Sequence, residues 1–186
     1  ALLAANNVVA HVPDIVDFVR GCALLLAPEG VATFEFPHLL RLVEGVQFDT
    51  VYHEHFSYLS LTSLSRVVEA AGLEVHDVEE VPTHGGSLRV YLQHRGGPRS
   101  VEPSVGRLLE LEEAAGMDDD WFYEGFQTEA DRVKDDLLRF LLEARADGRR
   151  VAAYGAAAKG NTLLNYAGVR PDLVSFVVDR NPAKQG

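Results

Sequence analysis

Four consecutive residues, Tyr52-His53-Glu54-His55, carry groups that could perform acid–base or metal chemistry. In an extended segment alternate side chains share a face, so we expect His53 and His55 to point one way and Tyr52 and Glu54 the other. A histidine oriented by an acid is a general base with a pKa near working pH. Four such side chains in succession would be costly in a core. We therefore interpret this cluster as a site of chemistry, with a solvated loop as the alternative.

Two neighbouring histidines also suggest zinc, as in a metal hydrolase. Against this, the helical H-E-x-x-H arrangement is absent and no third ligand stands nearby in the sequence. The single cysteine, Cys22, excludes an internal disulfide and a thiolate metal site built from this chain alone. Cys22 lies in an apolar helical pattern and is expected to be buried. We predict no metal site in this chain.

A run of small residues from Gly155 to Thr162 is the second candidate, between an expected strand and an expected helix. Backbone amides in such a turn can approach a phosphate, and the helix N-terminus favours negative charge. The run is neither the dinucleotide fingerprint nor a P-loop, because no central glycine separates Gly155 from Gly160 and Lys159 precedes Gly160. A tight turn for helix–sheet packing is an equal alternative, and Lys159 and Asn161 favour a ligand.

The third candidate is Asn6-Asn7 with His11, at the carboxyl end of an expected strand. Ligands of doubly wound sheets lie beyond those strand ends. A helix cap explains the asparagines equally well. Asp179 ends another expected strand, where it could accept a ribose hydroxyl or simply cap the strand.

The elements that must position these residues follow from hydrophobic periodicity and turn signals. The first half reads as a strand at 1–9, a helix with Pro13 and Asp14 in its first turn, a strand at 31–36, an aperiodic loop at 38–60, a helix capped by Thr62, and strands at 73–78 and 88–93. The second half reads as helical acidic material, a long helix opened by a capping box at Thr128, a buried strand at 151–154, a helix through Tyr166 and a strand at 173–178. The fold class is therefore α/β, with two partial modules joined by a helical linker.

Composition narrows the class of protein. The 186 residues are 47% hydrophobic and 24% charged, which is typical of globular proteins. No apolar run reaches the roughly 20 residues of a membrane helix, and no secretory signal is evident, so we expect a cytoplasmic location and no membrane partner. A net charge of -11 opposes binding to nucleic acid. The chain starts without methionine and stops early in its second module, so we expect it to be part of a longer protein.

Several motifs together resemble one family, the sugar-nucleotide C-methyltransferases. These are S-adenosylmethionine enzymes of deoxysugar biosynthesis, and they include the C-3 methyltransferases that make branched sugars of antibiotics. The motifs that carry the resemblance are Asn6 to Asp14, Phe34 to His38, Tyr52 to Ser60, Thr83 to Arg89 and Tyr154 to Thr162, which together span nearly the whole chain.

The resemblance implies a division of the chain into three parts. Residues 1–97 would be the C-terminal part of a Rossmann-like methyltransferase core, and residues 98–148 a helical linker. Residues 149–186 would be the first βαβ unit of an incomplete Rossmann-like domain that binds the sugar nucleotide. The family also has a cysteine-rich zinc module and a glycine-rich loop for the methyl donor. This chain has neither, so zinc is expected only in the missing N-terminal module.

The resemblance also implies a reaction on a dTDP-linked 4-keto deoxysugar. Removal of the C-3 proton gives an enolate, which attacks the methyl group of S-adenosylmethionine. His55 is the implied base, with Glu54, Tyr52 and His11 orienting or stabilising groups around the keto sugar. His53 is a supporting residue.

The remaining site residues are divided between donor and nucleotide. Asn6 and Asn7 are implied contacts of S-adenosylmethionine. The diphosphate of the sugar nucleotide would meet the second turn and a further cation, through Gly155, Lys159, Gly160, Asn161 and Arg89.

Two other classes stay open from the sequence. A nucleotide-dependent oxidoreductase would use the second βαβ unit with Asp179. A non-catalytic nucleotide-binding module would leave the histidine cluster as a surface loop.

Overall fold

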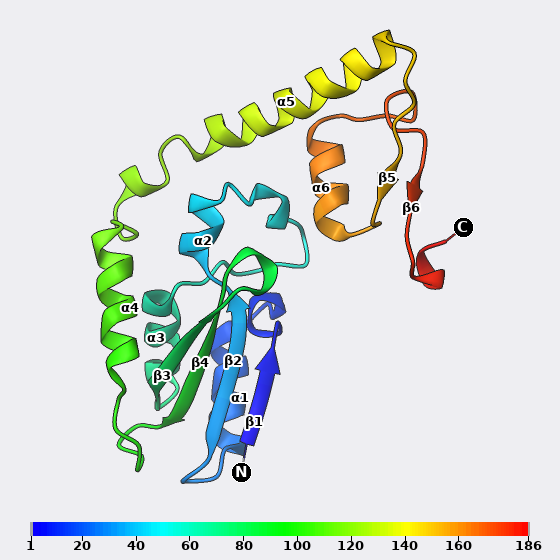
Figure 1. Cartoon of the computed structure of the whole chain (residues 1–186). Helices are drawn as coiled ribbons and strands as arrows, with labels where there is room; N and C mark the ends of the chain where they lie inside the picture. The colour runs from blue at the N-terminus through cyan, green and yellow to red at the C-terminus, as the bar shows by residue number, and fades with distance from the viewer. Residues whose placement is uncertain (1, 186) are drawn as a thin grey trace. The chain divides into compact units, whose positions relative to one another are not determined.

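The structure, a computed structural model, describes residues 2–185 and divides into two compact units (Figure 1). The first unit comprises Ala1–Gln47 and His53–Glu124, and the second comprises Phe48–Tyr52 and Gly125–Gly186. The proposed division at residues 97 and 148 stays a prediction.

A four-stranded sheet is the centre of the first unit. Its order is β1-β2-β4-β3, with β1 and β2 parallel and the β2–β4 and β4–β3 pairs antiparallel. The strands are β1 (Leu2–Asn6), β2 (Val31–Pro37), β3 (Leu73–Val81) and β4 (Ser87–His94). The prediction of an α/β fold is confirmed, and the four strands lie close to the ranges predicted for them.

Side-chain alternation gives this sheet two different faces. Phe34 and Phe36 of β2 are fully buried in the hydrophobic core, whereas Glu35 between them lies on the opposite, polar face. Helices α1 (Ile15–Leu25) and α3 (Leu61–Ala70) pack side by side and supply apolar residues to that core. Cys22 of α1 is buried among them, as predicted.

The helix caps differ from those predicted by one or two positions. Asp14 is the N-cap of α1 and accepts a hydrogen bond from the Asp17 amide, so it precedes the first turn. Ser60, not Thr62, caps α3, through a reciprocal capping box with Ser63. Ser60 is the N-cap because a cap residue needs an extended backbone, and Ser60 has one, with a φ of -106° and a ψ of 171°.

The expected aperiodic loop at 38–60 contains a helix, which the sequence reading missed. Helix α2 (Leu39–Glu44) buries Leu40 and Leu42, and a 3-10 turn, η2, follows at Phe48–Thr50.

Helix α4 (Pro103–Ala114) packs against α3 and β3, and its residues Val105, Leu108 and Glu112 are buried.

The second unit contains a long helix and a two-stranded parallel sheet. Helix α5 (Phe126–Ala146) begins after Gly125, so the predicted start at a Thr128 capping box is wrong. Strand β5 (Ala153–Tyr154), helix α6 (Ala158–Tyr166) and strand β6 (Val177–Val178) follow in the expected order. The strand expected to be buried at 151–154 is half-exposed to exposed, with Tyr154 at 72% exposure.

Strand β6 is also shorter than expected. The amides of Leu173 and Val174 both donate to the Arg170 carbonyl and form a turn, which leaves only two residues to pair with β5. Within residues 2–185, no helix is long and apolar enough to cross a membrane.

Candidate functional site

The first candidate site lies where β1 ends. Asn7 has a φ of 55°, a left-handed conformation that asparagine tolerates better than most residues. Its amide donates to the Glu35 carbonyl at 2.8 Å and so extends the β1–β2 ladder by one bond. Its side-chain oxygen Oδ1 is buried and lacks a hydrogen-bond partner within the described chain. A buried polar atom without a partner is a position where a ligand can bind.

A short 3-10 helix, η1 (Val9–His11), carries His11 from this strand end to the histidine cluster. The ring nitrogen Nδ1 of His11 lies 3.0 Å from the Glu54 carbonyl oxygen. A carbonyl only accepts, so Nδ1 carries the proton, and in the neutral ring Nε2 is the acceptor. The rings of His11 and His55 lie 4.6 Å apart, centroid to centroid, with an interplanar angle of 55°.

Backbone hydrogen bonds fix the segment that carries His55. The amides of Phe56 and Ser57 both donate to the Ala10 carbonyl, at 2.9 and 3.3 Å. The His55 ring also meets Tyr58 edge-on, with centroids 6.1 Å apart. These contacts bring together residues from η1 and from 54–58 that are distant in the sequence.

The expected side-chain alternation through the histidine cluster is wrong, because His53 and Glu54 form a turn and not an extended strand. His53 and Glu54 are exposed and His55 is half-buried. Glu54 therefore meets His11 through its backbone carbonyl. Tyr52 belongs to the segment that is grouped with the second unit.

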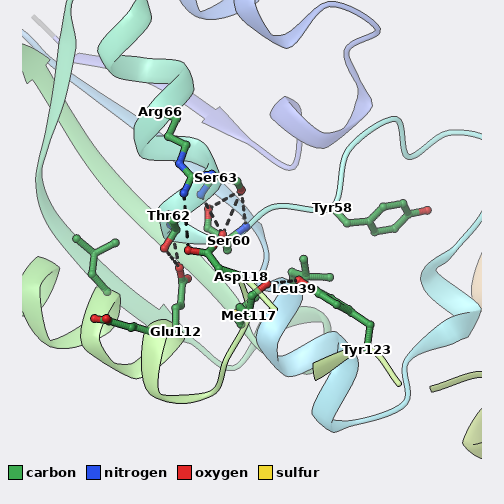
Figure 2. A pocket seen from close by; sticks show the side chains of 12 residues that line it. Leu39, Tyr58, Ser60, Thr62, Ser63, Arg66, Glu112, Met117, Asp118 and Tyr123 are labelled. Atoms are coloured by element: carbon green, nitrogen blue, oxygen red, sulfur yellow. Dashed lines mark hydrogen bonds and ion pairs between the residues drawn. The ribbon is translucent and has the colours of Figure 1, made fainter. Parts of the chain in front are cut away.

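A polar cavity of about 360 Å³ adjoins Tyr58 in the first unit (Figure 2). It lies between the first turn of α3 and the end of α4. Its polar lining includes Tyr58, Ser60, Thr62, Ser63, Arg66, Glu112, Glu113, Asp118 and Tyr123.

Glu112 is a buried site residue that the sequence reading missed. It is 1% exposed, and its carboxylate accepts hydrogen bonds from His38, from the amides of Leu61 and Thr62, and from the Thr62 hydroxyl. Burial raises the pKa of this carboxyl, but these hydrogen bonds outweigh it and hold the pKa below its ordinary value. The sequence does hold a signal for this residue. Glu112 falls at the same helical spacing as the apolar Val105 and Leu108, which places its carboxylate on the buried face of α4.

Arg89 lies on the polar face of the sheet, where it is paired with acids. Its Nε and Nη2 donate to Glu35 at 3.1 and 2.8 Å, and Nη1 lies 3.5 Å from Glu79. The hydrogen bond to Glu35 is the largest cause that raises the pKa of Arg89.

The turn between β5 and α6 is the candidate site of the second unit. Gly155 has a φ of 97°, which favours glycine, and its amide donates to the Val178 carbonyl. The amide of Ala156 donates to Asp179 at 2.7 Å, and the Asn181 amide donates to the other oxygen of the same carboxylate at 2.7 Å. These two backbone hydrogen bonds lower the pKa of Asp179 and give it a structural role.

Lys159, Gly160 and Asn161 occupy the first turn of α6. Its N-cap, Ala157, supplies no side-chain hydrogen bond to the helix amides. A cavity of about 560 Å³ adjoins this turn, and Gly155, Gly160 and Asn161 are among its lining residues. Lys184, which the sequence reading also missed, donates to the Ala156 carbonyl at 2.7 Å.

No group of three His, Cys, Asp or Glu side chains within residues 2–185 is arranged to hold a metal ion. His53 and His55 thus find no third ligand in this part of the chain.

The family models and the curated relative that match this chain all describe methyltransferases. Residues 82–186 match the family model described as C-methyltransferase C-terminal domain, and residues 2–78 match the one described as methyltransferase domain. The C-methyltransferase NovU of Streptomyces niveus is 37% identical over 185 residues, covering 100% of this chain and 44% of NovU. The chain therefore spans less than half the length of that relative.

The crystal structure of TnmH is 22% identical, with a TM-score of 0.39 over 50% of this chain and 30% of that chain. A likeness this low supports no conclusion.

Proposed function

Because this chain belongs to the C-methyltransferase family, we propose that it takes part in methyl transfer from S-adenosylmethionine to carbon, with a dTDP-linked 4-keto deoxysugar as acceptor. The proposed carbon is C-3. Its proton is acidic because the neighbouring ketone delocalises the charge left on removal. S-adenosylmethionine, when bound, supplies an electrophilic methyl group.

The observation that carries the proposal is the pairing of His11 with His55. We assign His55 as the base that removes the C-3 proton, since it is half-buried and held by backbone hydrogen bonds of the next two residues. His11 presents its Nε2 from a ring that Glu54 fixes in one tautomer. Tyr52 and Glu54 are the further residues proposed to orient the keto sugar.

The donor is proposed to bind at the carboxyl end of β1. The Oδ1 of Asn7, which has no hydrogen-bond partner among residues 2–185, fits a donor group with N–H or O–H, such as the ammonium of a methionyl moiety. Asn6 is adjacent at the same strand end. Ligand binding beyond the carboxyl ends of parallel strands is the general rule for such sheets.

The second unit is proposed to be the start of a Rossmann-like domain that binds the sugar nucleotide. The turn at Gly155, Lys159, Gly160 and Asn161 would receive the diphosphate, because α6 has no side-chain cap to satisfy its first amides. Arg89 is proposed as a further cation for the substrate. Its hydrogen bonds to Glu35 would have to be shared or exchanged when substrate binds.

The test uses the full-length enzyme with S-adenosylmethionine and a panel of keto sugar nucleotides. We expect one of them to gain a methyl group on carbon, detected by mass and located by NMR. No methyl gain on any member of the panel would contradict the proposed acceptor class. Methyl gain on oxygen or nitrogen would contradict the proposed transfer to carbon.

A further inference from the structure

We propose that Glu112 is a positioning residue for the loop that carries His55, a role that rests on the function proposed for His55. Glu112 comes from α4 and does not touch the histidine cluster. Its effect would pass through the backbone that it binds.

The hydrogen bonds of Glu112 use both carboxylate oxygens fully. Oε1 lies 2.7 Å from His38 Nε2 and accepts from the Leu61 amide at 2.6 Å. Oε2 accepts from the amide and the hydroxyl of Thr62, at 2.8 and 2.6 Å. A carboxylate offers about four acceptor positions, so this set occupies all of them. Figure 2 shows Glu112 reaching the first turn of α3.

These donors lie at the downstream end of the His55 loop. Leu61 and Thr62 begin α3 directly after the segment that holds Tyr58 and Leu59. His38 follows β2, and the adjacent Leu39 amide donates to the Leu59 carbonyl at 2.9 Å. Glu112 therefore joins the end of β2, the start of α3 and α4 at one point.

The upstream part of the loop is held independently by the Ala10 carbonyl. The amides of Phe56 and Ser57 make the upstream attachment, so Tyr58 lies between the two attachments and its ring packs edge-on against that of His55, with centroids 6.1 Å apart. If the downstream attachment loosens, Tyr58 can shift, and the His55 ring loses the neighbour that positions it. Displacements near 1 Å are enough to cost a well-oriented reaction much of its rate.

A charged acceptor is required at this position. Glu112→Gln keeps the length of the side chain but replaces one oxygen with a donor, which then faces N–H or O–H groups. Glu112→Asp keeps the charge and the acceptors but shortens the reach by one methylene. We therefore expect Glu112→Asp to retain more function than Glu112→Gln.

The first readout is amide hydrogen exchange in the full-length enzyme. Glu112→Gln should speed exchange in peptides that cover 53–62, while peptides of β3 and β4 stay protected. Leu73→Val serves as the control, because Leu73 is fully buried at the start of β3 and makes none of these hydrogen bonds. Equal protection of 53–62 in Glu112→Gln and in the wild type would overturn the proposal.

The second readout is deuterium incorporation at C-3 of a keto sugar nucleotide, which reports proton removal without methyl transfer. At a temperature where the variant is folded, we expect Glu112→Gln to slow incorporation roughly ten- to a hundred-fold. Donor affinity should stay within about three-fold, because misplacement of the base removes a transition-state interaction and not donor binding. A slowing no greater than in Leu73→Val would overturn the positioning role.

The two failures are distinguishable. If the wild-type enzyme incorporates no deuterium at C-3 of any keto sugar nucleotide, the proposed function fails and the positioning role falls with it. If the wild type incorporates deuterium and Glu112→Gln matches it, only the positioning role fails.

Discussion

The ring centroids of His11 and His55 lie 4.6 Å apart, and the backbone carbonyl of Glu54, the residue before His55, accepts a hydrogen bond from Nδ1 of His11 at 3.0 Å. This arrangement makes one histidine a fixed neighbour of the other. We therefore expect replacement of His55 and replacement of His11 to have different effects.

Replacing the proposed base should abolish most of the chemistry. We expect His55→Gln to lower kcat by about 10²- to 10⁴-fold with little change in donor affinity, because general-base contributions are of that size. His53→Gln is the matched control, since His53 is two residues away, exposed and in the turn. Steady-state methyl transfer measures both. Equal activity of the two variants would remove His55 from its role.

Replacing His11 should test the value of its hydrogen bond. His11→Phe keeps an aromatic ring beside His55 but loses the bond to the Glu54 carbonyl. We expect kcat/KM to fall by roughly five-fold, since a lost hydrogen bond is worth about 1 kcal/mol. The variant should remain folded by circular dichroism. An unchanged kcat/KM would show that the tautomer of His11 is irrelevant to turnover.

Asn7 combines a left-handed backbone with a side-chain oxygen that has no hydrogen-bond partner within residues 2–185, and two substitutions separate these effects. Asn7→Gly removes the carboxamide and suits the φ of 55°, whereas Asn7→Ala removes it and adds strain of about 1 kcal/mol or more. We expect both to weaken S-adenosylmethionine binding, measured by calorimetry, and only Asn7→Ala to lower the melting temperature. Donor affinity that is unchanged in Asn7→Gly would exclude the proposed contact.

The two glycines of the second turn should respond differently to alanine. Gly155 has a φ of 97°, so Gly155→Ala should destabilise the turn by about 1–2 kcal/mol although no atom obstructs the new methyl. Gly160 is helical, and its nearest neighbour to a new methyl is 3.8 Å away. Gly160→Ala should therefore gain about 0.5–1 kcal/mol of stability.

The same two variants should also differ in how well they bind the sugar nucleotide. We expect Gly155→Ala to raise KM for the nucleotide while Gly160→Ala, which adds only a methyl to the helix, changes it less. Thermal unfolding and KM together check the prediction. A higher KM from Gly160→Ala than from Gly155→Ala would contradict it.

The carboxyl of Glu112 should make the stability of the folded protein depend on pH. Its pKa in the folded protein lies below the ordinary 4.5, so the folded state binds its proton less readily than the unfolded state does. The contribution is therefore present above pH 4.5 and is lost as pH falls through the folded value. The melting temperature of Glu112→Gln should fall less steeply with acid than that of the wild type. Parallel curves would contradict this sign.

The order of the elements was predictable because strands and amphipathic helices differ in hydrophobic period. Helix α2 escaped prediction because it is short and its own leucines and valine leave no clean period across Leu39–Glu44. The reverse error occurred at 173–178, where apolar residues read as a strand but Arg170 draws the first of them into a turn. In this second case local hydrogen bonds determined the structure.

The sites were predictable to the extent that chain position determines them. The position of Asn7 and His11 after a strand end, where ligands commonly bind, is confirmed, and their roles stay predictions. The contact of His11 with His55 was not predictable, since it depends on how 54–58 folds back onto η1. Glu112 was missed because its importance arises from three partners that only the tertiary structure brings together.

The Ala10 carbonyl holds the amides of Phe56 and Ser57 without using either side chain. Main-chain attachment of this kind is indifferent to side-chain identity, and only proline, which has no N–H, breaks it. Phe56 is 58% exposed, so its side chain is available for change. A laboratory that seeks new acceptor sugars could therefore randomise position 56 and leave the base beside it in place.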